Sequence, residues 1–263
     1  MSRPSVHDVR GLRGVRQLSQ VYVATEEWAA ACDEAGIDIV VTEFGHQVER
    51  IGAAAPNVFF QVGVPYGTVV NADEALRSAF LALEQGASAI YCAASLKIVE
   101  AMADEGIPVV GHIGIVPSQV TWTNFRAIGK TFDEAKDLYR KMKAYEGAGA
   151  FGIEFEVIPE PIATALTQRT SLVTMSMGAG AGCNTQYLFA TDILGENTGH
   201  VPRHAKVYRD FASRRREMYD DAVAAFREYA ADIESGELPD ASRLVAEHDG
   251  VAEAFAAFLD DRD

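Results

Sequence analysis

Cysteine is scarce in this sequence. Its 263 residues include three cysteines, Cys32, Cys92 and Cys183, which lie far apart and form no CxxC pair. A disulfide framework or a structural zinc site needs cysteines at shorter, recurring spacings, so both are excluded. We therefore expect three reduced thiols in or near the core.

Long apolar runs are also missing. The first twenty residues, MSRPSVHDVRGLRGVRQLSQ, lack the apolar stretch of a secretory signal, and no apolar run reaches the length that spans a membrane. These absences predict a soluble, cytoplasmic protein with no membrane partner.

Basic residues are in the minority. Lys plus Arg number 23 and Asp plus Glu number 38, which gives a net charge of −15. A surface of this sign repels phosphate backbones and anionic lipid, so nucleic acid is disfavoured as a partner. The charge is better explained by solubility.

One pattern recurs through the first two thirds of the chain: an amphipathic helical stretch, a glycine, and a short β-branched run. It occurs as TEEWAAACDEAG before IDIVV, NADEALRSAFLALEQG before ASAIYC, SLKIVEAMADEG before IPVVG, and TFDEAKDLYRKMKAYEGAG before AFGIEFEVI. The predicted N-caps are Thr25, Asn71, Ser95 and Thr131, the last with Glu134 in a capping box, and the predicted left-handed C-terminal glycines are Gly36, Gly86, Gly106 and Gly147.

Alternating helices and short apolar strands predict parallel βαβ units. Seven strands are expected near 20–25, 37–42, 58–62, 87–92, 107–110, 149–157 and 170–176. An eighth near 185–190 would close a TIM barrel, although that segment is also compatible with a helix. We predict an α/β TIM (β/α)8 barrel with a C-terminal helical extension.

The C-terminal part of the chain reads as helical. Residues 203–233 have the pattern of a long amphipathic helix stopped by Gly236 and Pro239, and a shorter helical tail follows. No linker or low-complexity tract separates this part, so we predict one domain over 1–263, with 203–263 as its C-terminal helices.

Two glutamates stand out in the apolar segment FGIEFEVIP. In a strand, Glu154 and Glu156 leave on one side, whereas Ile153, Phe155 and Val157 leave on the other. Neighbouring carboxylates repel, so one holds a proton or a cation lies between them, and either state suits proton transfer or metal binding. The alternative is that this face meets solvent or an arginine of an outer helix.

The ends of other predicted strands carry further candidates, because a TIM barrel builds its active site there. His112 directly follows a buried strand and could contact a substrate oxygen, or it could be an ordinary core histidine. The cluster MGAGAGC offers backbone amides at Gly178 and Gly180 for an oxyanion, but it lacks the P-loop signature. Glu43 and His46 could bind a metal or could simply begin a surface helix.

Several motifs, in order along the chain, resemble those of the ketopantoate hydroxymethyltransferase family. They are DEAGID, VPYGT, GIPVVGHIGIVPSQV, GAGAFGIEFEVIPEPIA and MGAGAGCNTQYLFATDILG. The resemblance implies a TIM barrel of the phosphoenolpyruvate mutase and isocitrate lyase superfamily and a homo-oligomer. It also implies transfer of a hydroxymethyl group from methylenetetrahydrofolate to 3-methyl-2-oxobutanoate, with Mg²⁺ bound to the 2-oxo acid.

One half of the family's site matches residue by residue. Glu156 corresponds to the glutamate of the family's ECVP motif, which the resemblance makes the proton-transfer carboxylate. His112 corresponds to the histidine of GHIG, and the loop 178–182 matches as well. Glu154 stands where the family has an apolar residue.

The metal half departs from the family. Gly63 occupies the position of a metal-binding aspartate, and Tyr91 and Ala93 occupy those of a substrate-contacting lysine and an acid near the metal. Glu43 is the candidate to replace the aspartate of the family's GDSLG loop. Because Mg²⁺ prefers oxygen ligands that include carboxylates, we predict no inherited metal site, and we leave the cofactors open.

Three hypotheses follow for the function. The first is a hydroxymethyltransferase-like or lyase-type enzyme that makes or breaks a carbon–carbon bond in a small oxo or hydroxy acid, with Glu156, Glu154 and His112 catalytic and Gly178, Gly180 and Glu43 contacting substrate. The second is a true 3-methyl-2-oxobutanoate hydroxymethyltransferase with rearranged metal ligands. The third is a noncatalytic ligand-binding barrel, because a fold does not fix a function.

Overall fold

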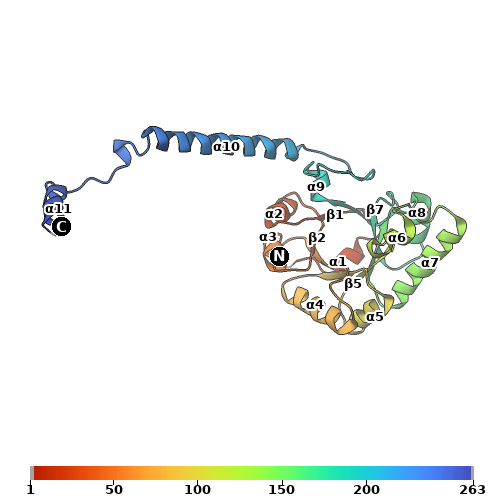
Figure 1. Ribbon diagram of the computed structural model, residues 1–263. Helices are drawn as coiled ribbons and strands as arrows, with labels where there is room; N and C mark the ends of the chain where they lie inside the picture. Colours follow the sequence, from red (N-terminus) through yellow and green to blue (C-terminus); the bar gives the residue numbers. More distant parts are fainter. Residues whose placement is uncertain (1–2, 262–263) are drawn as a thin grey trace. The chain divides into compact units, whose positions relative to one another are not determined.

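The structure is a computed structural model that describes residues 3–261 (Figure 1). The chain divides into two compact units, one up to Asp210 and one from Phe211 onward. All the described strands lie in the first unit, and the second contains helices and their connections. A single domain over 1–263 stays a prediction.

Eight strands close into one parallel barrel. In chain order they are β1 (Leu18–Tyr22), β2 (Ile39–Glu43), β3 (Phe59–Val64), β4 (Ala89–Cys92), β5 (Val109–Gly114), β6 (Gly152–Glu156), β7 (Val173–Met177) and β8 (Thr185–Phe189). Each pairs in parallel with its neighbours along the chain, and β1 pairs with β8. The predicted TIM barrel is confirmed, and its least certain strand forms because both barrel neighbours bind its backbone.

A short helix precedes β1, and helices follow the strands around the barrel except between β7 and β8, where residues 178–184 form none (Figure 1). They are α1 (Val6–Gly11), α2 (Glu26–Glu34), α3 (Val48–Ala54), α4 (Ala72–Glu84), α5 (Leu96–Asp104), α7 (Phe132–Gly147), α8 (Glu160–Thr167) and α9 (Ala190–Ile193). The 3₁₀ turn η1 (Pro117–Gln119) and the short α6 (Val120–Thr123) lie in the long connection between β5 and α7. This arrangement leaves the carboxyl ends of the strands facing the βα loops, where TIM barrels place their active sites.

The predicted N-caps begin their helices as expected. The side chains of Thr25, Asn71 and Thr131 each accept the backbone N–H three residues on, which satisfies a donor that the helix leaves free. Ser95 occupies the N-cap of α5 without a side-chain hydrogen bond.

Three of the four predicted C-terminal glycines have a positive φ. These are Gly36, Gly86 and Gly106. The fourth prediction was wrong: Gly147 is the last residue of α7, and the left-handed residue is Gly149, with φ of 84°. The left-handed residue lies two positions after the end of α7, because the backbone N–H of Gly149 still donates to the carbonyl of Glu146.

The predicted capping box at α7 is only half formed. Thr131 accepts from the backbone N–H of Glu134, but the Glu134 carboxylate accepts the N–H groups of Gly129 and Lys130 instead of that of Thr131. The guanidinium of Arg126 also pairs with this carboxylate at 2.6 Å. The glutamate therefore fastens the preceding loop to the helix start.

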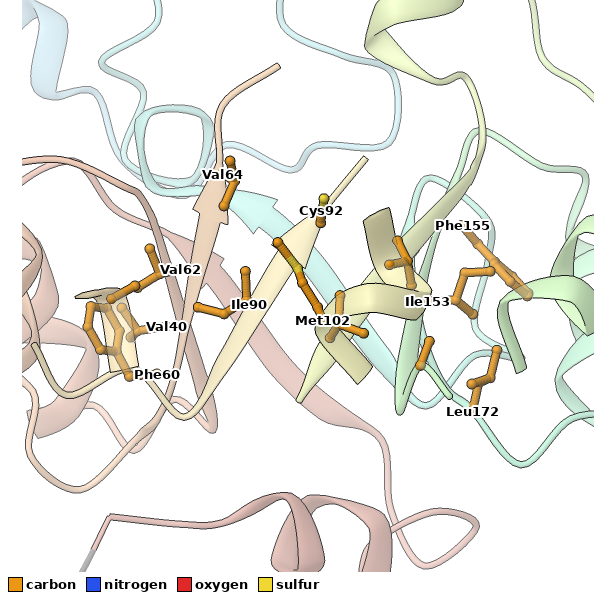
Figure 2. Close-up of a cluster of buried hydrophobic side chains, with 14 of the residues drawn as sticks. Val40, Phe60, Val62, Val64, Ile90, Cys92, Met102, Ile153, Phe155 and Leu172 are labelled. Carbon is orange, nitrogen blue, oxygen red and sulfur yellow. The ribbon is translucent and has the colours of Figure 1, made fainter. Parts of the chain in front are cut away.

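Strand residues alternate between two apolar layers. Residues such as Ile39, Val41 and Phe59 point into the barrel. Their neighbours point outward and pack against the helices; Figure 2 shows this outer layer, with Val40, Phe60, Val62, Val64, Ile90, Cys92, Met102, Ile153, Phe155 and Leu172 labelled. Burial on both faces explains the continuous apolar runs of the strands.

The three cysteines are free thiols. Cys92 and Cys183 are buried and Cys32 is half-buried. The prediction of reduced thiols in or near the core is confirmed in its placement.

The second unit is helical. It contains α10 (Phe211–Ser235), the 3₁₀ turn η2 (Ala241–Arg243) and α11 (Val251–Asp260). Among the described residues, no helix combines the length and the apolar character needed to cross a bilayer.

The long helix begins later than predicted. Its first residue is Phe211, whereas the periodicity placed the start at 203. The preceding segment is irregular and its backbone bonds to another part of the same unit: the N–H of Tyr208 donates to the carbonyl of Ile193. Periodicity alone does not detect such a long-range partner.

Candidate active site

A cavity of about 330 Å³ opens at the carboxyl ends of the strands. The residues that line it are Tyr22, Val41, Thr42, Glu43, Gly63, Val64, Pro65, Tyr66, Tyr91, Ala93, His112, Glu154, Glu156, Met177, Tyr187 and Phe189. Every strand of the barrel contributes at least one of them, so the fold collects side chains that are far apart in the sequence.

The two glutamates of β6 face this cavity and not an outer helix. Strand alternation turns both inward, while Ile153 and Phe155 join the outer apolar layer. Glu154 lies deeper, with 3 % of its surface exposed, and the side chain of Glu156, at the strand end, is 21 % exposed. One carboxylate is therefore enclosed and the other is reachable by a ligand.

His112 lies beside both carboxylates, because β5 pairs with β6 in a register that places His112 opposite Glu154. The ring's Nδ1 is 3.5 Å from the Glu154 carboxylate, and its Nε2 is 3.2 Å from that of Glu156. Nε2 also donates to the carbonyl of Ile115 at 2.9 Å. The imidazole is thus held at both nitrogens.

The surroundings of His112 favour its charged form. Burial opposes a charge here, but the hydrogen bonds and charges of Glu154 and Glu156 outweigh it and raise the pKa of His112 to about 9. Burial also raises the pKa of Glu154, and the contact with His112 opposes that rise. The three groups form an acid–imidazole–acid array in which the imidazole is held in its charged form.

Tyr91, near the end of β4, completes the contacts of the imidazole. Its hydroxyl is 2.8 Å from Nδ1 of His112, and the two rings meet edge to face with centroids 5.8 Å apart. The ring also covers Gly63, where a Cβ atom would lie 3.3 Å from Cδ1 of Tyr91. Burial and then the charges of Glu154 and Glu156 raise the pKa of Tyr91 well above its usual value, so the phenol keeps its proton.

Two buried polar side chains add hydrogen-bonding capacity. The Gln61 amide donates to Glu154 at 3.1 Å, and its own oxygen has no partner among the described residues. The Thr42 hydroxyl, at the cavity wall, likewise has none. Unpaired buried polar atoms are costly, so a cavity that retains them is suited to a polar ligand or ordered water.

The backbone around Glu156 is tightly constrained. Gly114 has φ of 102°, and a Cβ atom there would lie 2.1 Å from the carbonyl oxygen of Glu156, so only glycine fits. On the other side, Val157 has φ of 52°, an unusual value for a β-branched residue, while its N–H donates to the carbonyl of Met177. Such strain is typical of positions where the surrounding structure fixes a functional side chain.

Of the three residues predicted to contact substrate, one lines the cavity. Glu43 lines the cavity at the end of β2, whereas Gly178 and Gly180 are not among its described lining residues. Two amides of that glycine loop are already used: the N–H of Ala179 donates to Ser176 and that of Ala181 to Glu160. Substrate contact by the two glycines stays a prediction.

The sequence predicted no site role for His204, which was interpreted as part of the lead into the long helix. The imidazole of His204 packs over Gly178, where a Cβ atom would lie 2.7 Å from its Nδ1. Burial lowers the pKa of His204, and the nearby charge of Glu156 opposes this. No local sequence pattern predicts the position of His204, because it lies in an irregular segment and contacts a glycine of the loop after β7.

The donors around the cavity do not fit a magnesium ion of the kind that the family resemblance implies. Gly63 and Ala93 contribute no side-chain oxygen, and the carboxylates of Glu154 and Glu156 already contact an imidazolium. In residues 3–261 no group of three or more His, Cys, Asp or Glu side chains is placed to hold a metal. Mg²⁺ prefers octahedral oxygen ligands, including one or two carboxylates.

Fold and site together define a TIM-barrel enzyme with a buried acid–base array at the carboxyl ends of its strands. The family model described as ketopantoate hydroxymethyltransferase matches residues 24–241. The chain belongs to this family and is an enzyme of the hydroxymethyltransferase type, as the sequence motifs predicted. The noncatalytic hypothesis loses its support.

Curated relatives agree with this assignment. A 3-methyl-2-oxobutanoate hydroxymethyltransferase of Kosmotoga olearia is 31% identical over 260 residues, covering 89% of this chain and 95% of the relative. A protein of the same name from Chloroflexus aurantiacus is 36% identical over 207 residues, covering 77% and 71%.

Solved structures share the fold at low identity. A 2,3-dimethylmalate lyase, described as a member of the PEP mutase/isocitrate lyase superfamily, has a TM-score of 0.51 at 12% identity and covers 98% of this chain and 99% of its own. Oxaloacetate acetylhydrolase in complex with oxalate has a TM-score of 0.53 at 10% identity and covers 98% of both chains.

Proposed function

We propose that this enzyme makes or breaks a carbon–carbon bond of a small 2-oxo acid by aldol-type chemistry, with Glu156 transferring the proton. The observation that carries the proposal is the array of Glu154, His112 and Glu156, which faces a cavity at the catalytic end of the barrel. Aldol chemistry needs a base that removes a proton next to a carbonyl. Glu156 is the more accessible carboxylate and is suited to that role.

The cavity also indicates what kind of acid fits. Its volume of about 330 Å³ is at the small end of ligand pockets. His112 is the one cationic side chain among its described lining residues, against the three carboxylates of Glu43, Glu154 and Glu156. A second acidic group on the substrate would be repelled, so we propose a monoacid with an apolar side chain, which Val64 and the surrounding aromatic rings accommodate.

Deuterium exchange tests the proposal. In D₂O, the enzyme should exchange the hydrogen on the carbon next to the carbonyl of at least one member of a panel of 2-oxo monoacids, followed by proton NMR. Glu156→Gln should abolish this exchange, because an amide cannot accept the proton. The control Glu100→Gln changes an exposed glutamate of α5 and should exchange at the wild-type rate. Absence of exchange across the whole panel with folded wild-type protein would reject the proposal.

A second candidate is 3-methyl-2-oxobutanoate hydroxymethyltransferase itself, with rearranged ligands. It is favoured by the relatives of that name, one of which aligns over 89% of the chain. Expression in a pantothenate auxotroph distinguishes the two: growth supports this candidate, and failure to grow with well-expressed wild-type protein excludes it while leaving the broader proposal intact.

A further inference from the structure

The hydrogen bonds of His112 determine which way the Tyr91 hydroxyl can point. Nε2 of His112 faces two acceptors, the carbonyl of Ile115 and the carboxylate of Glu156, so it must carry a proton. Nδ1 faces the Tyr91 oxygen at 2.8 Å and Glu154 at 3.5 Å. When Nδ1 is protonated it donates to the Tyr91 oxygen, and the phenolic hydrogen must find another acceptor.

No second partner of the Tyr91 hydroxyl is present among residues 3–261. The hydroxyl belongs to a residue that lines the cavity, beside the imidazolium and the reachable carboxylate of Glu156. The oxygen of the Tyr91 hydroxyl accepts a hydrogen bond from the charged His112 ring. This bond polarises the O–H group, so the hydroxyl becomes a stronger donor toward another acceptor. Such a group is suited to a developing negative charge on oxygen.

We propose that Tyr91 donates this hydrogen bond to the carbonyl oxygen of the substrate and that Tyr91 and the His112 imidazolium together stabilise the enolate without a divalent metal. The inference rests on the proposed function and names the group that supports the charge. It follows from the donor set, in which Gly63 and Ala93 offer no oxygen ligand and the Tyr91 ring covers the space above Gly63.

The step balances without an oxidant or a second reactant. The carbon next to the carbonyl gives its proton to the Glu156 carboxylate. The electrons of that C–H bond form the C=C bond of the enolate, and the carbonyl π electrons move to oxygen. Tyr91 holds the oxygen by a hydrogen bond and keeps its own proton, which agrees with its raised pKa. Return of a deuteron from Glu156 to carbon gives the exchanged substrate.

A pH dependence follows from the same geometry. The titratable side chains that face the His112 ring are Glu154 and Glu156 on β6 and Tyr91 on β4, and Tyr145 of α7 reaches the His112 backbone. When His112 loses its Nδ1 proton near pH 9, Tyr91 must turn its hydrogen to that nitrogen and is lost as a donor to substrate. The exchange rate should therefore fall as pH rises through about 9.

Tyr91→Phe tests the inference. We expect the maximal exchange rate to fall by about 100-fold, the loss typical of one oxyanion donor, with little change in KM. The fall of the residual rate near pH 9 should become smaller, because the charge of His112 is still lost there but the Tyr91 hydroxyl no longer contributes. Tyr139→Phe removes a hydroxyl from a half-exposed tyrosine of α7 and should behave as wild type. Near-ultraviolet circular dichroism and the unfolding midpoint verify that the variants fold.

Gly63→Ala tests the position of the Tyr91 hydroxyl without removing it. Its methyl would press on the Tyr91 ring from 3.3 Å and displace the hydroxyl while leaving it present. We expect a loss of rate smaller than that of Tyr91→Phe. Wild-type exchange in both folded variants would overturn the role of Tyr91.

Metal removal completes the test. Wild-type protein treated with EDTA should keep its exchange rate, and added Mg²⁺ should not raise it. If EDTA abolishes exchange and Mg²⁺ restores it, the metal-free inference is wrong while the proposed function stands. If the untreated enzyme exchanges no member of the panel, the proposed function fails and the inference falls with it.

Discussion

At the scale of single residues, the site depends on one buried imidazole between two acids. Burial and the nearby charge of Glu156 raise the pKa of Glu154, and His112, whose two nitrogens contact the two acids, opposes that rise. The protonation of His112 therefore depends on both glutamates and cannot be assigned from the histidine alone.

Stability should fall with rising pH because of His112. Its folded pKa, about 9, is above the value of 6.5 for an ordinary histidine. The stabilisation is fully present below pH 6.5 and is lost as pH rises through 9, with an effect on the order of a few kcal/mol. Urea unfolding between pH 6 and pH 9.5 measures it. Glu154→Gln should reduce the loss, because it removes one of the charges that raise the pKa, and the exposed-site control His248→Gln should leave it unchanged.

The acids of the array were predictable and the tyrosine's role was not. Alternation along one strand places Glu154 and Glu156 on one face, and the predicted strand near 107–110 leads directly to His112. His112 lies within β5 and not after it, because that strand continues to Gly114. The contact of Tyr91 with His112 depends on the register between β4 and β5, and that of Gln61 with Glu154 crosses the barrel interior. A single sequence does not specify such pairings.

At the scale of elements, the joints between helices and strands follow ordinary capping rules. Strand and helix positions largely agree with the periodicity because most strand residues are buried on both sides of the barrel wall and the helices around it pack apolar residues against the strands. The two boundaries that failed have different causes: α10 begins at Phe211 because Tyr208, just before it, bonds to Ile193, whereas at the end of α7 a local bond from Gly149 to Glu146 moves the left-handed residue.

Two glycines at the end of α7 should respond oppositely to alanine. Gly147 is helical, and nothing lies within 4 Å of a Cβ atom built there, so Gly147→Ala should be neutral or stabilise by about 0.4–1 kcal/mol. Gly149 has φ of 84° and a Cβ atom there would lie 2.8 Å from Ala103, so Gly149→Ala should destabilise by about 1 kcal/mol or more. Urea unfolding compares them directly. Equal effects would contradict the assigned left-handed position.

At the scale of the whole molecule, the two compact units differ in what they bury. The barrel unit contains both core clusters, whereas α10 has no buried residue. Tyr219, Phe226 and Ile233 recur every seven residues along α10 and are 67%, 72% and 51% exposed. A seven-residue apolar repeat is the pattern of helices that pair with other helices.

This pattern gives a prediction about assembly. The protein should form a homo-oligomer through α10, and Phe226→Glu should lower its molar mass because it places a charge in the apolar repeat. Ala224→Glu introduces the same side chain on the opposite face of the helix and should leave the mass unchanged. Light scattering coupled to size-exclusion chromatography measures both. A monomeric wild type, or equal masses for all three proteins, would exclude α10 as the interface.

The close fit between Gly63 and Tyr91 also links the side chains that the two positions can accept. With the tyrosine in place, any side chain at position 63 would press on its ring, so an acidic residue introduced there would displace the hydroxyl that contacts His112. Substitutions at the two positions should therefore be coupled: a side chain at position 63 should be tolerated better when position 91 carries a smaller residue than tyrosine.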